Sequence, residues 1–220
     1  MGRQQTKEIK IDDFVNARCL DLISYQNKSL SKEYRKIIED LRDVVKSNSD
    51  EDISLVKATI KNLYKVMAYK DEYEVARLHI KNNPKKEVQE LYPSTKNVYY
   101  HLSPPFAPKD SSTGRPKKYA IPSNFIRPLF FLLSHLRKLR GTVFDFLGYR
   151  KERRNERELI RMYQSDIELV KENYEFSEKC ILQQLLDLPE IVRGFGPIKH
   201  ESFRKYKKLR KNLRYKIIEI

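Results

Sequence analysis

Apolar residues recur every three or four positions along most of the chain, a spacing that predicts α-helices. The clearest stripe lies in the first third of the chain and comprises Ile53, Val56, Ile60, Leu63, Tyr64 and Met67. Continued in the same register, the stripe reaches Asp71 and Glu74 before apolar residues return at Val75 and Leu78. Because burial of an unpaired carboxylate is costly, we expect these two acids to be paired with cations or to belong to a functional site.

Two basic residues flank the acids at helical spacing and form the opposite-charge pairs Lys70–Glu74 and Glu74–Arg77. We interpret this cluster as a buried ion network that tethers one part of the fold to another, and a polar docking site is the alternative. Arg140 and Arg193 lie further along the chain in the glycine turns RGT and RGFG. We predict that one of the two acids is largely buried and bonded to one of these arginines.

Asp145 and His101 complete the candidate site. Asp145 follows the RGTVF turn, and His101 lies in the segment VYYHLS at 98–103, which is typical of a short strand. A second such segment, KKYAIP at 117–122, predicts a β-hairpin with a long connecting loop. Of the four histidines, His101 is the one that we select for a functional test, and an ordinary strand residue is the alternative.

The whole pattern predicts a mainly α fold, an irregular helical bundle of about seven helices with one small β-hairpin. We expect a disordered lead over residues 1–10 and a single helical domain over 11–220. One long helix is expected to run from the cap-forming turn at 47–52 to the NNP stop at 82–84. The segment 123–138 is so rich in Phe and Leu that we expect its helix to be buried on most sides.

Composition and motifs exclude several kinds of site and leave the partner open. The formal net charge is +15, which suits nucleic acid, an anionic membrane surface or an acidic protein equally well. The two cysteines, Cys19 and Cys180, form no metal-binding cluster, and no phosphate loop, dinucleotide fingerprint or nucleophile elbow occurs. We therefore predict that this chain binds no cofactor or metal itself. The absence of a long apolar run or a secretory leader predicts a cytoplasmic protein with no membrane partner.

The last predicted helix is strongly basic. Between Lys199 and Lys216 it carries nine Lys and Arg residues and the single acid Glu201, with interleaved aromatic residues. This pattern permits a basic helical nucleic-acid-binding protein, because cations contact phosphates and aromatic rings stack on bases. The same aromatic residues also fit an ordinary packing stripe with a solvated charged face, which is the interpretation that we prefer.

Six ordered motifs resemble a known family: VMAYKDEYEVARL at 66–78, HLSPP at 101–105, TGRPKK at 113–118, LRGTVFD at 139–145, ERRNERELI at 152–160 and LPEIVRGFGPIK at 188–199. Together they resemble the C-terminal domain, to which no function is assigned, of the large single-chain bacterial indolepyruvate ferredoxin oxidoreductases. The resemblance covers most of the chain.

The resemblance implies an accessory domain or split subunit that is not catalytic alone. Other parts of such an enzyme bind thiamine diphosphate, Mg²⁺ and an iron–sulfur cluster. They decarboxylate an aryl 2-oxoacid such as indolepyruvate to an acyl-CoA and pass electrons to ferredoxin. The implied partners are those catalytic domains or that subunit, with ferredoxin involved only indirectly. A fragment, a separate subunit and a non-functional gene remnant all remain compatible with the sequence.

Overall fold

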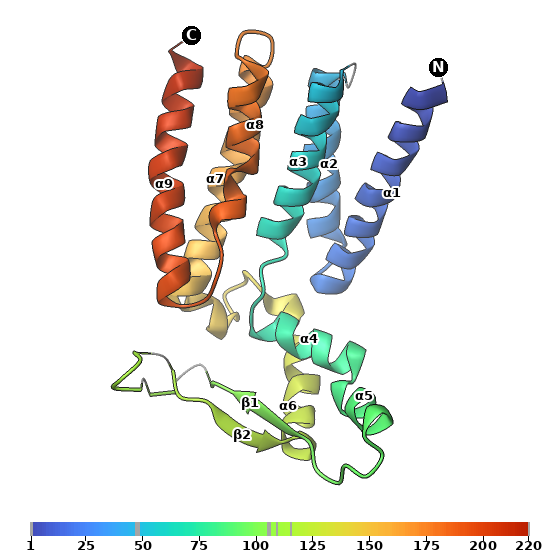
Figure 1. The fold of residues 1–220 in the computed structure, drawn as a ribbon, viewed down its shortest axis with the longest axis vertical. Helices are drawn as coiled ribbons and strands as arrows, with labels where there is room; N and C mark the ends of the chain where they lie inside the picture. The colour runs from blue at the N-terminus through green and yellow to red at the C-terminus, as the bar shows by residue number, and fades with distance from the viewer. Residues whose placement is uncertain (1, 47–48, 105–106, 109, 115, 220) are drawn as a thin grey trace. The chain divides into compact units, whose positions relative to one another are not determined.

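The computed structural model describes residues 2–46, 49–104, 107–108, 110–114 and 116–219. Its chain divides into two compact units (Figure 1). Unit 1 is discontinuous and contains residues 1–69 and 148–220, whereas unit 2 contains residues 70–147. The described residues form nine α-helices and one two-stranded antiparallel sheet, which confirms the mainly α fold with a small hairpin. The two units have separate hydrophobic cores, and the stretch 11–220, which we expected to form a single helical domain, contains both cores.

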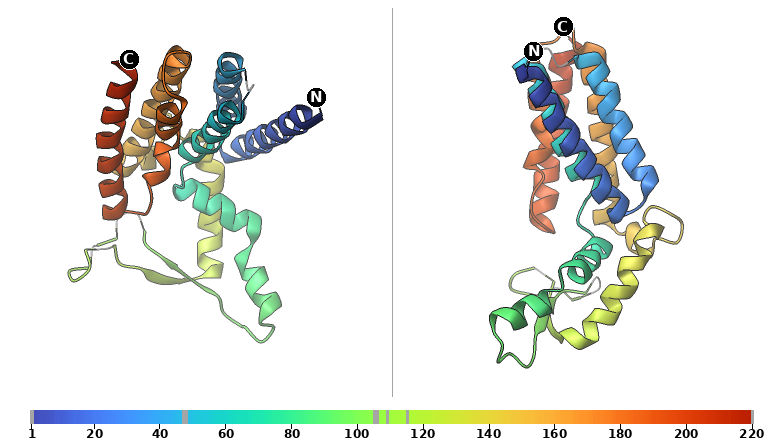
Figure 2. Two further views of the ribbon diagram at one scale, coloured as in Figure 1. Left: turned by 45° about the horizontal axis from the view of Figure 1, so that its top comes forward. Right: turned by 90° about the vertical axis from the view of Figure 1, so that its right-hand side faces the viewer.

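Unit 1 is a bundle of long helices that run along one another, with α1 diverging towards its N-terminal end (Figure 2). Its helices are α1 (Gly2–Tyr25), α2 (Lys28–Val45), α3 (Asp50–Met67), α7 (Lys151–Asn173), α8 (Lys179–Asp187) and α9 (Pro197–Ile218). The short 3-10 helix η3 (Leu188–Ile191) connects α8 to the turn before α9. Helix α1 begins at Gly2, within the stretch 1–10 that we expected to be a disordered lead.

Helix α3 is central to unit 1, since it contacts α1, α2, α7 and α8. Its first turn is fixed by a capping box in which Ser49 and Asp52 bond to each other's backbone amides, a pattern that satisfies two otherwise unpaired donors. This confirms the predicted helix start. Ser47 and Asn48, which we assigned to the same turn, lie outside the described residues, as do Pro105 and Arg115 of the family motifs.

The long helix that we expected is two helices. α3 ends at Met67, and α4 (Glu72–Asn82) begins after the non-helical residues 68–71. Asp71 is the N-cap of α4, with its Oδ1 accepting a 2.8 Å hydrogen bond from the amide of Glu74. The apolar stripe is therefore interrupted because the helix stops there, and the break coincides with the boundary between the two units at residues 69 and 70.

Unit 2 contains α4, α5 (Pro84–Leu91), the strands β1 (Tyr99–Leu102) and β2 (Tyr119–Pro122), and α6 (Ser123–Leu136). The strands pair as the predicted hairpin, with His101 opposite Ala120. α6 packs against α4, and a small core forms around Ala76, Ile126 and Phe130. Two short 3-10 helices follow, η1 (Arg137–Leu139) and η2 (Phe146–Tyr149), the second of which crosses the boundary between the units.

Candidate functional site

The strongest polar feature of the chain is a buried ion pair in unit 2. Asp71 and Arg140 each have only 3% of the side chain exposed. The guanidinium of Arg140 donates from Nε to Oδ2 of Asp71 at 2.6 Å and from Nη2 to Oδ1 at 2.8 Å. This two-pronged geometry is the strongest form of an arginine–carboxylate interaction. It confirms the prediction that one acid of the stripe is largely buried and bonded to Arg140 or Arg193, and the partner is Arg140.

Asp145 closes the turn that follows Arg140. Its Oδ2 accepts a 2.9 Å hydrogen bond from the amide of Gly141, and its Oδ1 accepts one of 3.0 Å from the hydroxyl of Tyr73 on α4. Burial, followed by this bond to a carboxylate, raises the pKa of Tyr73 well above its usual value. Arg140 and Asp145 thus attach both ends of the turn to the first residues of α4.

Glu74 and Arg77 form a second buried pair one turn further along α4. Arg77 donates from Nε and Nη2 to the two carboxylate oxygens of Glu74, each bond measuring 2.7 Å. Both side chains are about nine-tenths buried. The predicted Glu74–Arg77 pair is therefore present, and the two pairs place four buried charges within unit 2.

The turn between the two attachment points, the 140–146 loop, is held by its own backbone. Thr142 donates its amide to the carbonyl of Leu139 at 2.9 Å, and Asp145 donates its amide to the carbonyl of Thr142 at 3.1 Å. Gly141 has φ +79°, a conformation that residues with a Cβ rarely adopt. The apolar side chains of this loop point outward: Val143 is 74% exposed, Phe144 62% and Phe146 80%.

Two of the predicted site residues do not join this cluster. His101 is exposed on β1. Arg193 belongs to unit 1, where its Nε donates to the carbonyl of Glu190 at 2.8 Å. Lys70, the remaining candidate, directly precedes the Asp71 cap. The cluster therefore consists of Asp71, Glu74, Arg77, Arg140 and Asp145, with Tyr73 as the member that sequence reasoning missed.

Helix α6 differs from its prediction in a way that matters for function. Its buried residues follow one narrow face, at Ser123, Ile126, Phe130 and Ser134. Four other apolar side chains of this helix are exposed, with Phe125 at 78%, Leu129 at 47%, Phe131 at 58% and Leu132 at 56%. The expected burial on most sides is therefore wrong, because unit 2 supplies a packing partner for only one face of this helix.

A histidine that we had not selected lies beneath α6. The ring of His79 stacks on Phe130 at a centroid distance of 4.9 Å and meets Tyr100 edge-on at 5.1 Å. Its Nδ1 is buried without a hydrogen-bond partner among the described atoms. Burial, and then the charge of Lys70, lower the pKa of His79. The only feature of the sequence that indicated its burial is its position at the apolar spacing of α4.

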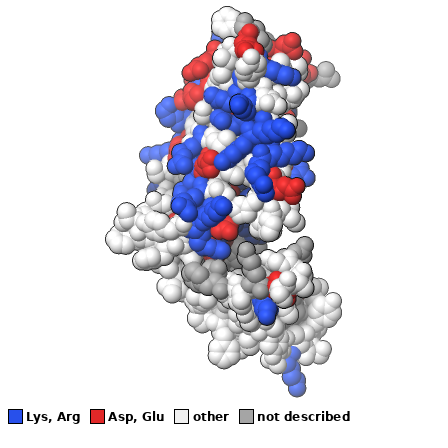
Figure 3. All heavy atoms as spheres, turned by 90° about the vertical axis from the view of Figure 1, so that its left-hand side faces the viewer, with Lys and Arg blue, Asp and Glu red and all other residues white. Residues whose placement is uncertain are grey.

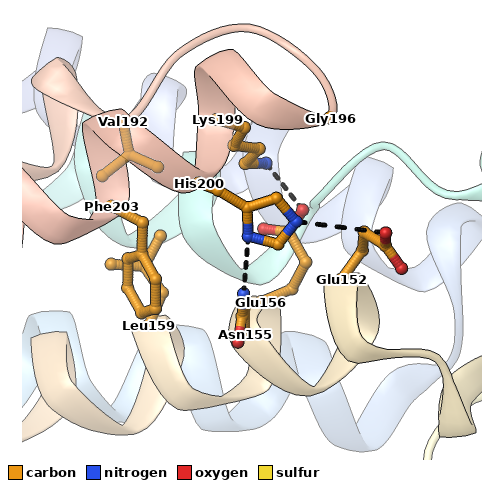
Figure 4. Close-up of a pocket in the computed structure, with 9 residues that line it drawn as sticks. All are labelled: Glu152, Asn155, Glu156, Leu159, Val192, Gly196, Lys199, His200 and Phe203. Atoms are coloured by element: carbon orange, nitrogen blue, oxygen red, sulfur yellow. Dashed lines mark hydrogen bonds and ion pairs between the residues drawn. The ribbon is translucent and has the colours of Figure 1, made fainter. Parts of the chain in front are cut away.

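Unit 1 contains a small open pocket between the N-terminal turns of α7 and α9 (Figure 4). In this pocket Lys199 binds Glu156 at 2.6 Å, and the amide of Asn155 donates to Nδ1 of His200 at 3.3 Å. Nε2 of His200 lies 4.0 Å from Glu152. Because each polar group already has a partner within the pocket, this arrangement resembles a helix-to-helix clamp more than a ligand site.

The basic face of α9 is partly neutralised. Arg210 and Arg214 both bind the fully buried carboxylate of Asp166, at 2.8 and 2.7 Å, and Lys207 binds Glu158 at 2.6 Å. Five other basic residues of α9 are exposed and enter none of the ion pairs found in the described part of the chain. They are Arg204, Lys205, Lys208, Lys211 and Lys216. Figure 3 shows Lys and Arg side chains gathered on this face of unit 1.

Residues 11–212 match a family of unknown function, DUF6537. The chain belongs to this family. No curated protein and no solved structure matches it. The match spans both units, so the buried ion pairs of unit 2, the exposed face of α6 and the basic face of α9 as far as residue 212 lie within the DUF6537 region.

The described residues of this DUF6537 chain combine buried ion pairs with exposed apolar and basic surfaces. They contain no group of three or more His, Cys, Asp or Glu side chains that could hold a metal ion. Nor is any described helix long and apolar enough to cross a membrane. Each buried carboxylate is bound by a cation or by hydroxyl and amide donors. These bonds hold the neighbouring segments, and the surfaces that they carry, in place.

Proposed function

We propose that this chain is an accessory C-terminal domain or split subunit of a bacterial indolepyruvate, or more generally 2-oxoacid, ferredoxin oxidoreductase. The proposal has two supports, the resemblance of its ordered motifs and the exposed apolar face of α6. Thiamine diphosphate, Mg²⁺ and the iron–sulfur cluster would be bound by other parts of the enzyme. The setting would be cytoplasmic.

The exposed face of α6 is the structural observation that carries this proposal. Phe125, Leu129 and Leu132 recur at helical spacing and are each about half to four-fifths exposed. Scattered exposed apolar residues are ordinary, but a helix that is apolar on its exposed face as well is typical of a surface covered by another protein. An accessory domain has such a covering partner in the catalytic part of its enzyme.

The proposal is tested by mixing the purified chain with the catalytic chain of such an enzyme from the same organism. We expect the two to co-elute in gel filtration, and indolepyruvate-dependent reduction of ferredoxin to require the catalytic chain. The chain alone, given thiamine diphosphate, Mg²⁺, coenzyme A and indolepyruvate, should show no activity. Activity of the chain alone, or separate elution of the two proteins, would contradict the proposal. Separate elution from every catalytic chain is the result that a gene remnant predicts.

A second candidate function is nucleic-acid binding by α9. It is favoured by Arg204, Lys208 and Lys211, which follow one exposed helical row and have no acidic partner among the ion pairs of the described residues. Filter binding at several salt concentrations separates the two candidates. The accessory role predicts only weak, sequence-independent binding that disappears at physiological salt, whereas a dedicated binder keeps affinity and sequence preference there.

A further inference from the structure

We propose that the 140–146 loop is a preorganised anchor that inserts Phe144 into an apolar pocket with an acidic rim on a partner protein. This inference rests on the proposed accessory function, because it names the part of unit 2 that makes the decisive contact. It also assigns a purpose to the buried ion pair, which holds the loop in the shape that the partner recognises.

The first observation is the concentration of exposed apolar groups. Val143, Phe144 and Phe146 fall within four consecutive positions and are 62–80% exposed. Asp145, the one polar residue among them, has its side chain 3% exposed and turned inward to the amide of Gly141 and the hydroxyl of Tyr73. The loop therefore buries its acid and exposes its aromatic rings, the reverse of an ordinary solvated turn.

The second observation is the rigidity of the loop. Arg140 is fixed by two bonds to Asp71, and Asp145 by bonds to Gly141 and Tyr73. Thr142 adds a hydroxyl bond of 2.7 Å to the carbonyl of Leu139 and accepts the amide of Phe144 at 3.3 Å. A loop that is already ordered loses little conformational entropy on binding, so its side chains contribute more of their contact energy to affinity. Buried aromatic anchors of this kind dominate many interfaces.

The third observation is the charge of the segment that leads into the loop. Between Asp110 and Asp145 the sequence contains no acidic residue but seven Lys and Arg residues. Of these, Arg127 on α6 and Lys138 in η1 are exposed, and neither enters an ion pair in the part of the chain that the structure describes. Charge complementarity therefore favours a partner surface that carries carboxylates beside its apolar pocket.

The same charge would also suit an anionic lipid surface. A bilayer has no fixed pocket, however. Binding to a bilayer therefore does not depend on the fixed loop shape that Asp71 and Asp145 maintain. The ordered geometry of the 140–146 loop therefore favours a protein partner. The exposed face of α6 adds further exposed apolar residues to unit 2, and a stable interface needs more area than one loop provides.

The experiment uses the catalytic chain of the 2-oxoacid oxidoreductase as the probe and measures its affinity for four forms of this chain. These are the wild type, Phe144→Asp, Thr142→Gly and Phe176→Asp. Phe176 is the matched control, because it is 78% exposed but lies in unit 1. We expect Phe144→Asp to weaken binding by at least about 30-fold, Thr142→Gly by about two- to fivefold through greater loop freedom, and Phe176→Asp not measurably.

The outcomes separate the two proposals. If the wild type does not bind the catalytic chain, the accessory function is overturned and this inference with it. If the wild type binds and Phe144→Asp binds equally well, only the anchor is overturned.

Two further measurements test whether a membrane or a second copy of the chain binds the loop instead. Loss of vesicle binding in Phe144→Asp, measured with phosphatidylglycerol vesicles, would assign the loop to a membrane. Loss of self-association would assign it to a second copy of the chain. Either result would overturn the proposed partner.

Discussion

At the scale of single residues, Asp71 has two roles that can be separated. One carboxylate oxygen caps α4, and the carboxylate also neutralises the buried guanidinium of Arg140. Asparagine is as good a cap as aspartate but carries no charge. Asp71→Asn therefore keeps the cap, leaves Arg140 buried without its counter-charge, and should destabilise unit 2 by about 3 kcal/mol.

The measurement is hydrogen exchange of α4 peptides followed by mass spectrometry, since it reports on unit 2 separately. Asp12→Asn is the matched control, because Asp12 pairs with Arg42 at 2.6 Å but is 55% exposed. Exposed pairs contribute at most about 1 kcal/mol, so this control should exchange nearly as the wild type does. Equal protection in the two variants would show that the Asp71–Arg140 pair is not a major source of stability.

His79 should make unit 2 sensitive to pH. Its pKa is lowered in the folded chain by burial and by Lys70, so below about pH 6.5, the ordinary histidine value, the unfolded state binds more protons than the folded state. The stability from neutral His79 is thus fully present above that pH and is lost as the pH falls through the lowered folded value.

His79→Phe should keep the stacking on Phe130 and remove this proton uptake. We expect the protection of unit 2 against hydrogen exchange to fall between pH 7 and pH 5.5 in the wild type, and to fall less in His79→Phe. The exposed His135 provides the control, since His135→Phe should retain the wild-type slope. An unchanged slope in His79→Phe would exclude His79 as the titrating group.

The Asp71–Arg140 pair could be predicted from the sequence, because an acid in an apolar stripe requires a buried cation and few arginines lie in turns. Sequence spacing did not distinguish Arg140 from Arg193, since the choice depends on which turn the chain places beside Asp71. The role of Tyr73 was missed for a different reason. A tyrosine on an apolar face fits ordinary packing, and only its 3.0 Å bond to Asp145 shows its second function.

At the scale of elements, α6 shows why hydrophobicity alone does not predict burial. The sequence of this helix is apolar on most sides, but a helix is covered only where a neighbour packs against it. Here the buried face follows Ile126 and Phe130, and Leu129 remains 47% exposed. The hairpin, in contrast, was predictable because short alternating segments bounded by turn residues have few other folded forms.

This contrast gives a direct test of the α6 surface. Leu129→Lys should change the free energy of unfolding of unit 2 by less than about 0.5 kcal/mol, as expected for an exposed position. Phe130→Ala, its direct neighbour in sequence, should lower that free energy by about 3 kcal/mol, because Phe130 is 6% exposed and forms the small core. Urea titration of hydrogen exchange in α6 measures both. A large loss in Leu129→Lys would show that this face is packed in solution.

The break between α3 and α4 was also missed, although its signal was present. Asp71 followed by acids at positions 72 and 74 is a typical helix start. The continuous apolar stripe on both sides of it outweighed that signal in our prediction. Two helices that share one register look like a single helix until a cap is recognised between them.

At the scale of the whole molecule, the division into two units predicts what should happen when one unit is deleted. Unit 2 is an insertion between residues 69 and 148 of unit 1. A sequence pattern does not show such an insertion, because each helix of both units carries the same periodicity. The two separate cores reveal it.

Unit 1 should fold without unit 2. Replacing residues 70–147 by about six Gly and Ser residues, which span roughly 13 Å, removes the small core and leaves the large one complete. The remaining ends are fixed within unit 1. The carbonyl of Tyr69 accepts a 2.9 Å hydrogen bond from the hydroxyl of Tyr25. The carbonyl of Gly148 accepts one of 2.7 Å from Arg157. We expect a monomeric helical protein with a cooperative unfolding transition by circular dichroism.

The same shortened chain separates the functions that we assign to the two units. It keeps the basic face of α9 and loses both α6 and the 140–146 loop. It should therefore retain whatever weak, salt-sensitive binding to nucleic acid the whole chain shows, and should no longer co-elute with the catalytic chain of the oxidoreductase. Retained co-elution would move the docking surface to unit 1. A shortened chain that is unfolded would instead show that the large core depends on unit 2.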